Sequence, residues 1–224
     1  MIGVFDSGVG GFCALRELRR LLPSEDIVYL ADRKNAPYGT KCQEEIIALT
    51  QADIKRLQDY QVNKILIACC TASSVHEFLD KEEREISLPI IRPAAQTAAE
   101  GRRIAVIATE RTVSSAVFSK EISKISDAKV VEFPAQRLVT LVEEGCRDGR
   151  INTECERELC RFAELTADAE ADTLILGCTH FSHLEGELQK RCKIKTVSPA
   201  REGAAALTRM ITKSHGERGR IIYI

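Results

Sequence analysis

Short apolar runs alternate along this chain with longer segments in which apolar residues recur at helical spacing. Each run has the length of a buried strand and ends in polar or glycine-containing residues. Strands are predicted at 2–5, 27–30, 64–68, 90–91, 103–108, 129–133, 173–176 and 195–197. Helices are predicted at 15–22, 43–60, 75–85, 114–125, 136–144, 153–169, 182–191 and 202–213. Strands that alternate with helices are typical of βα units and predict mostly parallel sheets.

Two of the predicted strands end in nearly the same way. The run 64–68 leads into the letters CCTA, and the run 173–176 leads into GCTH. Two related strand ends that each carry a thiol predict two facing halves, with one sulfur on either side of a shared cleft. That geometry suits a reaction that needs a base on one face of a substrate and an acid on the other.

The position of these thiols favours a chemical role for them. A cysteine just before a helix lies near backbone N–H groups and the positive helix end, which lower the pKa of a thiol. A single buried cysteine is more often an inert apolar filler. Two at matching places favour the functional interpretation, and His180 lies close enough in sequence to Cys178 to exchange a proton with it.

The 224 residues are enough for two lobes of roughly 100 residues each. No linker rich in glycine, serine or proline separates them, but Pro89 and Pro199 restrict their neighbours and mark two plausible crossings between lobes. We expect a first α/β lobe at 1–92 and 200–224, and a second at 93–199.

Composition and charge exclude several functions. Apolar residues make up 44% of the chain and charged residues 29%, with a formal net charge of -1, so no basic field would attract nucleic acid or an anionic membrane. No apolar stretch has the length of a membrane span. The first residues lead into Asp6 without the basic region of a signal peptide. We therefore expect a cytoplasmic protein without nucleic-acid or membrane partners.

Nine cysteines would indicate a disulfide framework in a small secreted protein, but nothing in this chain indicates export. No pair has the C-x-x-C spacing that is typical of zinc sites. We expect most of these thiols to be reduced and structural, and we expect no metal.

A glycine-rich turn, Asp6-Ser7-Gly8-Val9-Gly10-Gly11, follows the first predicted strand. It is not a dinucleotide-binding turn, because Cys13 replaces the third glycine and Asp6 would repel a phosphate. The glycines would instead let backbone N–H groups approach a small carboxylate. A purely structural turn is the alternative.

Three weaker motifs lie near the same predicted edges. The loop 37–39 (Pro-Tyr-Gly) follows the second strand, and Glu143 ends a predicted helix. Thr109 and Thr112 follow the strand 103–108, where a capping box is an equally good interpretation. Ligands of open α/β sheets bind beyond the carboxyl ends of the strands, so these positions are candidates for a site.

Taken together, these motifs resemble the cofactor-independent aspartate/glutamate racemase superfamily, and glutamate racemases in particular. The matching motifs are Asp6-Ser7-Gly8-x-Gly10-Gly11, Pro37-Tyr38-Gly39, Ala68-Cys69-x-Thr71-Ala72, Leu141-Val142-Glu143-Glu144-Gly145 and Leu176-Gly177-Cys178-Thr179-His180. The resemblance covers nearly the whole chain. It implies two pseudo-symmetric three-layer α/β lobes with mostly parallel sheets, glutamate bound between them, no cofactor and a homodimer.

The resemblance also implies a role for each matching residue. Cys69 and Cys178 would exchange the Cα proton, with Cys178 acting on L-glutamate and Cys69 on D-glutamate. Asp6 and His180 would tune the thiols, and Glu143 would assist near His180. The implied substrate-binding residues are Ser7, Pro37, Tyr38, Gly39, Cys70, Thr71, Thr109, Thr112 and Thr179. The implied product is D-glutamate for peptidoglycan.

The chain departs from the family's pattern at several positions. Cys70 stands where the family has asparagine, whose amide is a stronger hydrogen-bond donor than a thiol. Ala108 replaces a turn glycine, Ser182 replaces a proline, and the segment 134–137 replaces a small apolar pattern. Two alternatives follow: a racemase of aspartate or another acidic amino acid, and a catalytically weak relative that binds an amino acid or a protein partner.

The doubled cysteine leaves a question of register. Matching the Cys-Thr pairs would align Cys70 with Cys178, whereas matching the distance from the strand end aligns Cys69. Adjacent side chains in an extended segment point to opposite sides, so the two thiols cannot face the cleft equally. The family resemblance selects Cys69.

Overall fold

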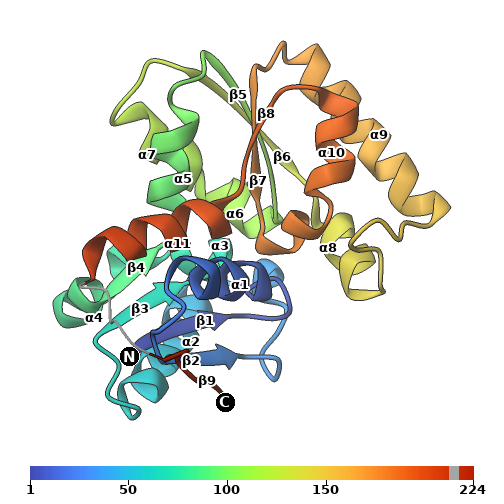
Figure 1. The fold of residues 1–224 in the computed structure, drawn as a ribbon. Helices are drawn as coiled ribbons and strands as arrows, with labels where there is room; N and C mark the ends of the chain where they lie inside the picture. The colour runs from blue at the N-terminus through green and yellow to red at the C-terminus, as the bar shows by residue number, and fades with distance from the viewer. Residues whose placement is uncertain (212–216) are drawn as a thin grey trace.

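Two parallel β-sheets form the framework of the molecule (Figure 1). The computed structural model describes residues 1–211 and 217–224. The strand order of the first sheet is β4 (Ser87–Pro89), β3 (Lys64–Ile67), β1 (Ile2–Asp6), β2 (Ile27–Ala31) and β9 (Ile221–Tyr223). The order of the second sheet is β6 (Lys129–Pro134), β5 (Arg103–Ala108), β7 (Thr173–Gly177) and β8 (Lys195–Val197).

The two sheets share one topology. Taken in chain order, the first four strands of each sheet are arranged fourth, third, first and second, and β9 extends only the first sheet. All of these strand pairs are parallel. Strand β1 therefore corresponds to β5, and β3 corresponds to β7. The residues that follow these strands lie at equivalent carboxyl ends.

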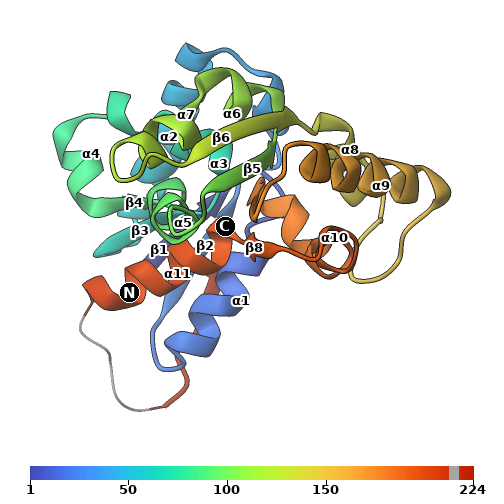
Figure 2. The ribbon, with the colours of Figure 1, turned by 90° about the horizontal axis from the view of Figure 1, so that it is seen from above.

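Helices cover both faces of the sheets. They are α1 (Phe12–Leu21), α2 (Gln43–Gln58), α3 (Cys70–Ser73), α4 (Lys81–Ile86), α5 (Ile91–Ala98), α6 (Glu110–Ser115), α7 (Val117–Ser123), α8 (Gln136–Glu143), α9 (Thr153–Asp168), α10 (Glu185–Cys192) and α11 (Pro199–Met210). The described residues also form short 3-10 helices at η1 (Tyr38–Thr40), η2 (His76–Phe78) and η3 (Thr179–His183). Helix α11 contacts α1 and α5 and lies between the two sheets (Figures 1 and 2).

Successive residues of each strand enter different cores. Val4 joins an apolar cluster that contains residues of both sheets, whereas Phe5 points to the opposite face and joins the cluster under α2. In the second sheet, Val106 joins the shared cluster and Ile107 joins a cluster under α8, α9 and α10. Strands buried on both faces appear in a sequence as continuous apolar runs. The predicted fold class, with two three-layer α/β lobes and mostly parallel sheets, is confirmed.

The predicted strand at 90–91 is wrong. Strand β4 lies just before it, and Ile90 is the N-cap of α5, which was not predicted. Pro93 is tolerated there because the first turn of a helix has free N–H positions. Ile90 and Ile91 are buried at the start of α5. Two apolar residues are too few for their periodicity to distinguish a helix from a strand.

Two predicted helices are divided. The segment 114–125 contains the end of α6 and all of α7, because Ala116 takes the left-handed conformation at φ 51. The segment 75–85 contains η2 and most of α4. Strand β9 was not predicted, and positions 212 and 213 of the predicted helix 202–213 lie outside the described residues.

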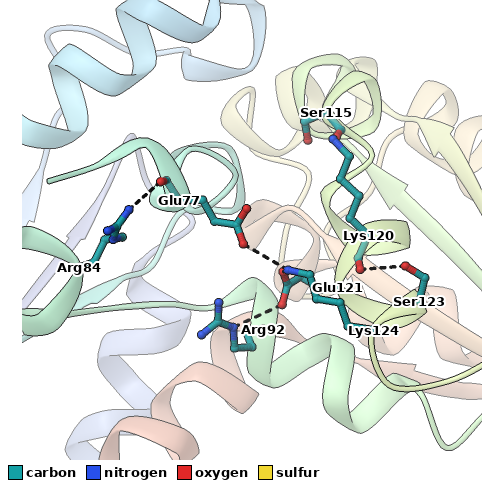
Figure 3. A network of polar contacts seen from close by, with 8 residues as sticks. All are labelled: Glu77, Arg84, Arg92, Ser115, Lys120, Glu121, Ser123 and Lys124. Atoms are coloured by element: carbon teal, nitrogen blue, oxygen red, sulfur yellow. Dashed lines mark hydrogen bonds and ion pairs between the residues drawn. The ribbon is translucent and has the colours of Figure 1, made fainter. Parts of the chain in front are cut away.

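Ion pairs connect η2 and α5 with α7 and the residue that follows it (Figure 3). Lys124 contacts Glu77 at 3.2 Å and also contacts Glu121, while Arg92 lies 3.3 Å from Glu121. These side chains border a cavity of about 600 Å³. None of the described residues that line it is a cysteine.

Candidate active site

Cys69 and Cys178 occupy the same local position in the two halves. Cys69 is the N-cap residue between β3 and α3, and Cys178 is the N-cap residue between β7 and η3, both with extended backbone. Cys70 is the first residue of α3 and joins the apolar cluster shared by the two sheets. By local structure Cys69, and not Cys70, is therefore the counterpart of Cys178. Burial, followed by the nearby Cys178, raises the pKa of Cys70 well above its ordinary value.

Both counterpart thiols line one small cavity with a volume of about 20 Å³. This is little more than the roughly 10–15 Å³ that one water molecule requires. Its walls are Ser7, Ala36, Pro37, Tyr38, Gly39, Cys69, Cys70, Thr71, Thr109, Gln136, Val139, Glu143, Cys178, Thr179 and His180. An amino acid is larger than this space, so its entry requires the walls to move apart.

Two of the sequence-predicted site residues, Asp6 and Thr112, lie behind the wall, and all the others line the cavity. Thr112 Oγ1 lies 2.9 Å from Thr109 Oγ1 and 3.4 Å from Thr71 Oγ1, which makes one buried hydroxyl cluster. Thr109 also caps α6 by accepting a hydrogen bond from the Thr112 N–H, which is one of the two bonds of the alternative capping-box interpretation. The cluster offers neutral donors and acceptors from both halves of the molecule.

Three wall residues were not predicted: Ala36, Gln136 and Val139. Gln136, Val139 and Glu143 are spaced i, i+3 and i+7 on α8 and therefore share one face of that helix. Helical periodicity counted back from Glu143 was the signal that would have identified the other two.

A relay of two titratable side chains, His180 and Glu143, extends from Cys178. The Cys178 sulfur lies 3.5 Å from His180 Nδ1, and His180 Nε2 lies 3.2 Å from Glu143 Oε1. Burial acts to lower the pKa of His180, but Cys178 and Glu143 raise it well above its ordinary value. The hydrogen bond from His180 in turn lowers the pKa of Glu143. His180 thus links the Cys178 sulfur to the Glu143 carboxylate through two hydrogen bonds.

The hydrogen-bond partners of Cys69 are neutral. Its sulfur lies 3.3 Å from Ser7 Oγ and 3.5 Å from the backbone N of Ala72. Burial, followed by the charge of Asp6, raises the pKa of Cys69 to about 12. The predicted lowering by the helix end is wrong at this position, because α3 has only 4 residues and desolvation of the sulfur outweighs it. Cys69 is therefore a protonated thiol at neutral pH.

The glycine-rich turn brings the first half against η3. Asp6 accepts hydrogen bonds from the Gly8 N–H at 2.8 Å and from Thr179 Oγ1 at 3.2 Å. Burial raises the pKa of Asp6, and the charge of His180 opposes that rise. A Cβ on Gly10 would lie 2.2 Å from Thr179 Oγ1 and 2.8 Å from the His180 N. Glycine is therefore required for this approach, whereas carboxylate binding by the turn stays a prediction.

The wall residue Tyr38 is held from behind by two buried carboxyl groups. Its hydroxyl lies 2.7 Å from Asp32 Oδ2 and 3.0 Å from Asp53 Oδ2. Burial, followed by the charge of Asp32, raises the pKa of Asp53 to about 7. Because the hydroxyl carries one proton, it donates to one carboxylate and accepts from Asp53 when that group is protonated. This clamp fixes the turn 37–39 against the cavity.

Neither a metal centre nor a membrane span was found in the described part of the chain. No cluster of three or more histidine, cysteine, aspartate and glutamate side chains is arranged there to hold a metal ion. Among the same residues, no helix combines the length and apolarity needed to cross a bilayer.

The fold and the cavity define a class of α/β protein in which two similar halves each contribute a thiol to one site. Residues 13–207 match the model of the family described as Asp/Glu/Hydantoin racemase. The chain belongs to this racemase family.

Individual relatives are similar over most of the chain. A glutamate racemase of Limosilactobacillus reuteri is 34% identical over 217 residues, which are 94% of this chain and 80% of the relative. A glutamate racemase of Microcystis aeruginosa is 37% identical, over 89% of this chain and 71% of the relative. The structure of a Francisella tularensis glutamate racemase in complex with D-glutamate has a TM-score of 0.90 and 28% identity. It covers 99% of this chain and 86% of the other.

Proposed function

We propose that this chain is a cofactor-independent racemase that interconverts L- and D-glutamate by moving a proton at Cα between two thiols. The observation that carries the proposal is the pair Cys69 and Cys178, buried at equivalent strand ends on one cavity. The glutamate racemases of similar sequence, and the D-glutamate in the Francisella tularensis structure, support glutamate as the substrate.

The surroundings of the two thiols suggest the direction of each step. With L-glutamate bound, the Cys178 thiolate takes the Cα proton from one face, and the Cys69 thiol gives its proton to the opposite face. The electron pair left on Cα forms the new C–H bond, which gives D-glutamate and a thiolate on Cys69. The Ser7 hydroxyl and the Ala72 N–H lie within hydrogen-bond distance of that sulfur. The reverse sequence of steps converts D-glutamate.

The difficulty of the reaction is the weak acidity of the Cα–H bond. The pocket must stabilise developing negative charge with fixed donors and exclude water. Cys69, Cys178 and His180 are themselves buried in the cavity walls, which suits that requirement. The proposed substrate-binding residues are Ser7, Pro37, Tyr38, Gly39, Cys70, Thr71, Thr109, Thr112 and Thr179. Asp6, His180 and Glu143 are proposed to set the charge around the two thiols.

We further propose that residues 1–92 with 200–224 form one lobe and residues 93–199 the other. The matching strand orders of the two sheets support that division. A homodimer, a cytoplasmic location and a role in supplying D-glutamate for peptidoglycan follow from the family resemblance and stay predictions.

Deuterium incorporation tests the proposed reaction. Incubation with L-glutamate in D2O should give D-glutamate with deuterium at Cα. Both product and label should be lost in Cys69→Ser and in Cys178→Ser. Cys160→Ser, which changes an exposed cysteine of α9, should retain them.

The exchange assay, together with calorimetry, separates the alternatives. Exchange with aspartate but not with glutamate would identify an aspartate racemase instead. Tight binding of an amino acid by calorimetry, without exchange at any pH, would identify a binding protein.

A further inference from the structure

Gln136 is a polar wall residue of the cavity that no step of the proposed mechanism uses. It is the first residue of α8, in the segment 134–137 that departs from the family's small apolar pattern. Its Oε1 atom is buried and has no hydrogen-bond partner among the described residues. Buried carbonyl oxygens are costly to leave unpaired, so such an atom in a ligand cavity indicates a contact made by the ligand.

The position of Gln136 places it at one end of the cavity. Oε1 would lie 2.8 Å from a Cβ built on Gly39, and the same Cβ would lie 3.0 Å from Thr109. Glu143, seven residues further along the same face of α8, contacts His180 at the other end. Two helical turns correspond to about 10 Å along the axis. Gln136 therefore borders the substrate space and is separated along α8 from Glu143, while Cys69 and Cys178 line the same cavity.

The other strong acceptors near the cavity already have donors. Asp6 accepts from Gly8 and Thr179, and Glu143 accepts from His180. A bound amino acid brings an α-ammonium group with N–H donors, and a carbonyl oxygen can only accept. The free acceptor and the substrate's donor are thus complementary.

We propose that Gln136 Oε1 accepts a hydrogen bond from the α-ammonium group of the bound amino acid. Gln136 is then a substrate-binding residue, and this assignment rests on the proposed function because it takes an amino acid as the occupant. The same amide turned through 180° would present N–H groups to a substrate carboxylate. The two orientations predict opposite effects of a negative charge at this position.

Steady-state kinetics of two variants separate these orientations. Gln136→Leu removes the acceptor and should raise KM for L-glutamate about 10-fold, with kcat changed less than about 3-fold. Gln136→Glu keeps an acceptor and should have a KM equal to or below that of the unmodified protein. The control is Gln58→Leu, at an exposed position of α2. An unchanged KM in Gln136→Leu, or a larger KM increase in Gln136→Glu than in Gln136→Leu, would overturn the assignment.

Calorimetry gives a readout that does not depend on activity. Gln136→Leu should weaken binding of L-glutamate about 10-fold and leave binding of glutarate, which lacks the ammonium group, unchanged. Equal weakening of both ligands would contradict the contact. If the unmodified protein binds glutamate but exchanges no Cα proton, the proposed function fails and the contact is still measured. If it binds no amino acid, both fail.

Discussion

The segments around Cys69 and Cys178 have similar extended backbones at the cysteine but different electrostatic surroundings. Each cysteine is the residue that precedes a helical turn after the third strand of its sheet. Cys178 faces an imidazolium–carboxylate pair, whereas Cys69 faces a hydroxyl and a backbone N–H. A repeated topology thus supplies two equivalent positions with different neighbours, and the proposed mechanism assigns proton acceptance from L-glutamate to one and proton donation to the other.

The largest effect is expected from displacing η3, which follows Cys178, away from the glycine-rich turn after β1. Gly10→Ala places a Cβ 2.2 Å from Thr179 Oγ1, so η3 must shift. Displacement of catalytic groups by about 1 Å costs on the order of 100-fold in rate, and we expect kcat/KM to fall about that far. Gly186→Ala is the control, because nothing lies within 4 Å of a Cβ there. Equal activity of the two folded variants would show that Cys178 does not depend on this contact.

Removing the charge at the end of the relay should have a smaller effect with a pH signature. In Glu143→Gln a neutral amide replaces the carboxylate that helps to raise the pKa of His180. His180 loses its proton as pH rises through its folded-state pKa. Because that pKa is lower in the variant, the high-pH limit of activity should move to a lower pH. At neutral pH kcat should fall about 10-fold.

The pH profiles of Glu143→Gln and of Glu144→Gln, its exposed neighbour, provide the measurement. If the high-pH limit of activity is the same in both variants, Glu143 does not hold the proton of His180. A shift in Glu143→Gln alone supports the relay.

Sequence reasoning succeeded where local pattern determines structure. Strands buried on both faces appear as apolar runs, and Cys178 and His180 are close in the chain, so both the fold class and this pair could be predicted. For the doubled cysteine, the residues alone left two registers open and only the family resemblance selected Cys69; the structure adds the physical reason, because Cys70 begins α3 while Cys69 precedes it.

What could not be predicted depends on contacts between distant segments. Strand β9 forms by pairing with β2 from the far end of the chain. The raised pKa of Cys69 results from burial by surrounding elements and from Asp6 on another strand. The sequence reveals only the helix end beside the cysteine, which lowers the pKa of the thiol. At Cys69 this lowering is weaker than the rise caused by burial.

Behind the segment around Cys69, the Tyr38 clamp predicts a pH-dependent change in stability. The folded-state pKa of Asp53 is about 7, above the roughly 3.9 of an unfolded aspartate. The folded state therefore holds a proton that the unfolded state has released, and stability falls as pH rises between these values. Asp53→Asn should remove that loss. The change in the free energy of unfolding caused by the substitution should therefore be more favourable at pH 8 than at pH 4, by about 1–3 kcal/mol.

Urea unfolding at the two pH values measures this difference, with Asp59→Asn, beyond the end of α2, as the control. A greater gain at pH 4 than at pH 8 would show that the Asp53 proton is not retained on folding.

The smallest effect is expected at the neutral contact of Cys69. Ser7→Ala removes a hydroxyl 3.3 Å from the sulfur but leaves the Ala72 N–H, and a bond to sulfur is weak. We expect kcat to fall about 3-fold, against no change in the exposed Ser114→Ala. A loss of about 100-fold would mean that Ser7 relays a proton, and the two segments would then be alike.

The asymmetry itself is tested most directly by Cα-deuterium isotope effects on the two enantiomers in His180→Asn. Loss of the imidazole should slow only the proton transfer at Cys178. Cys178 removes the Cα proton when L-glutamate reacts and donates a proton to Cα when D-glutamate reacts. We expect the isotope effect of His180→Asn with L-glutamate to be larger than that of the unmodified protein, and the isotope effect with D-glutamate to be close to unity. A larger effect with D-glutamate, or the same change with both, would contradict it.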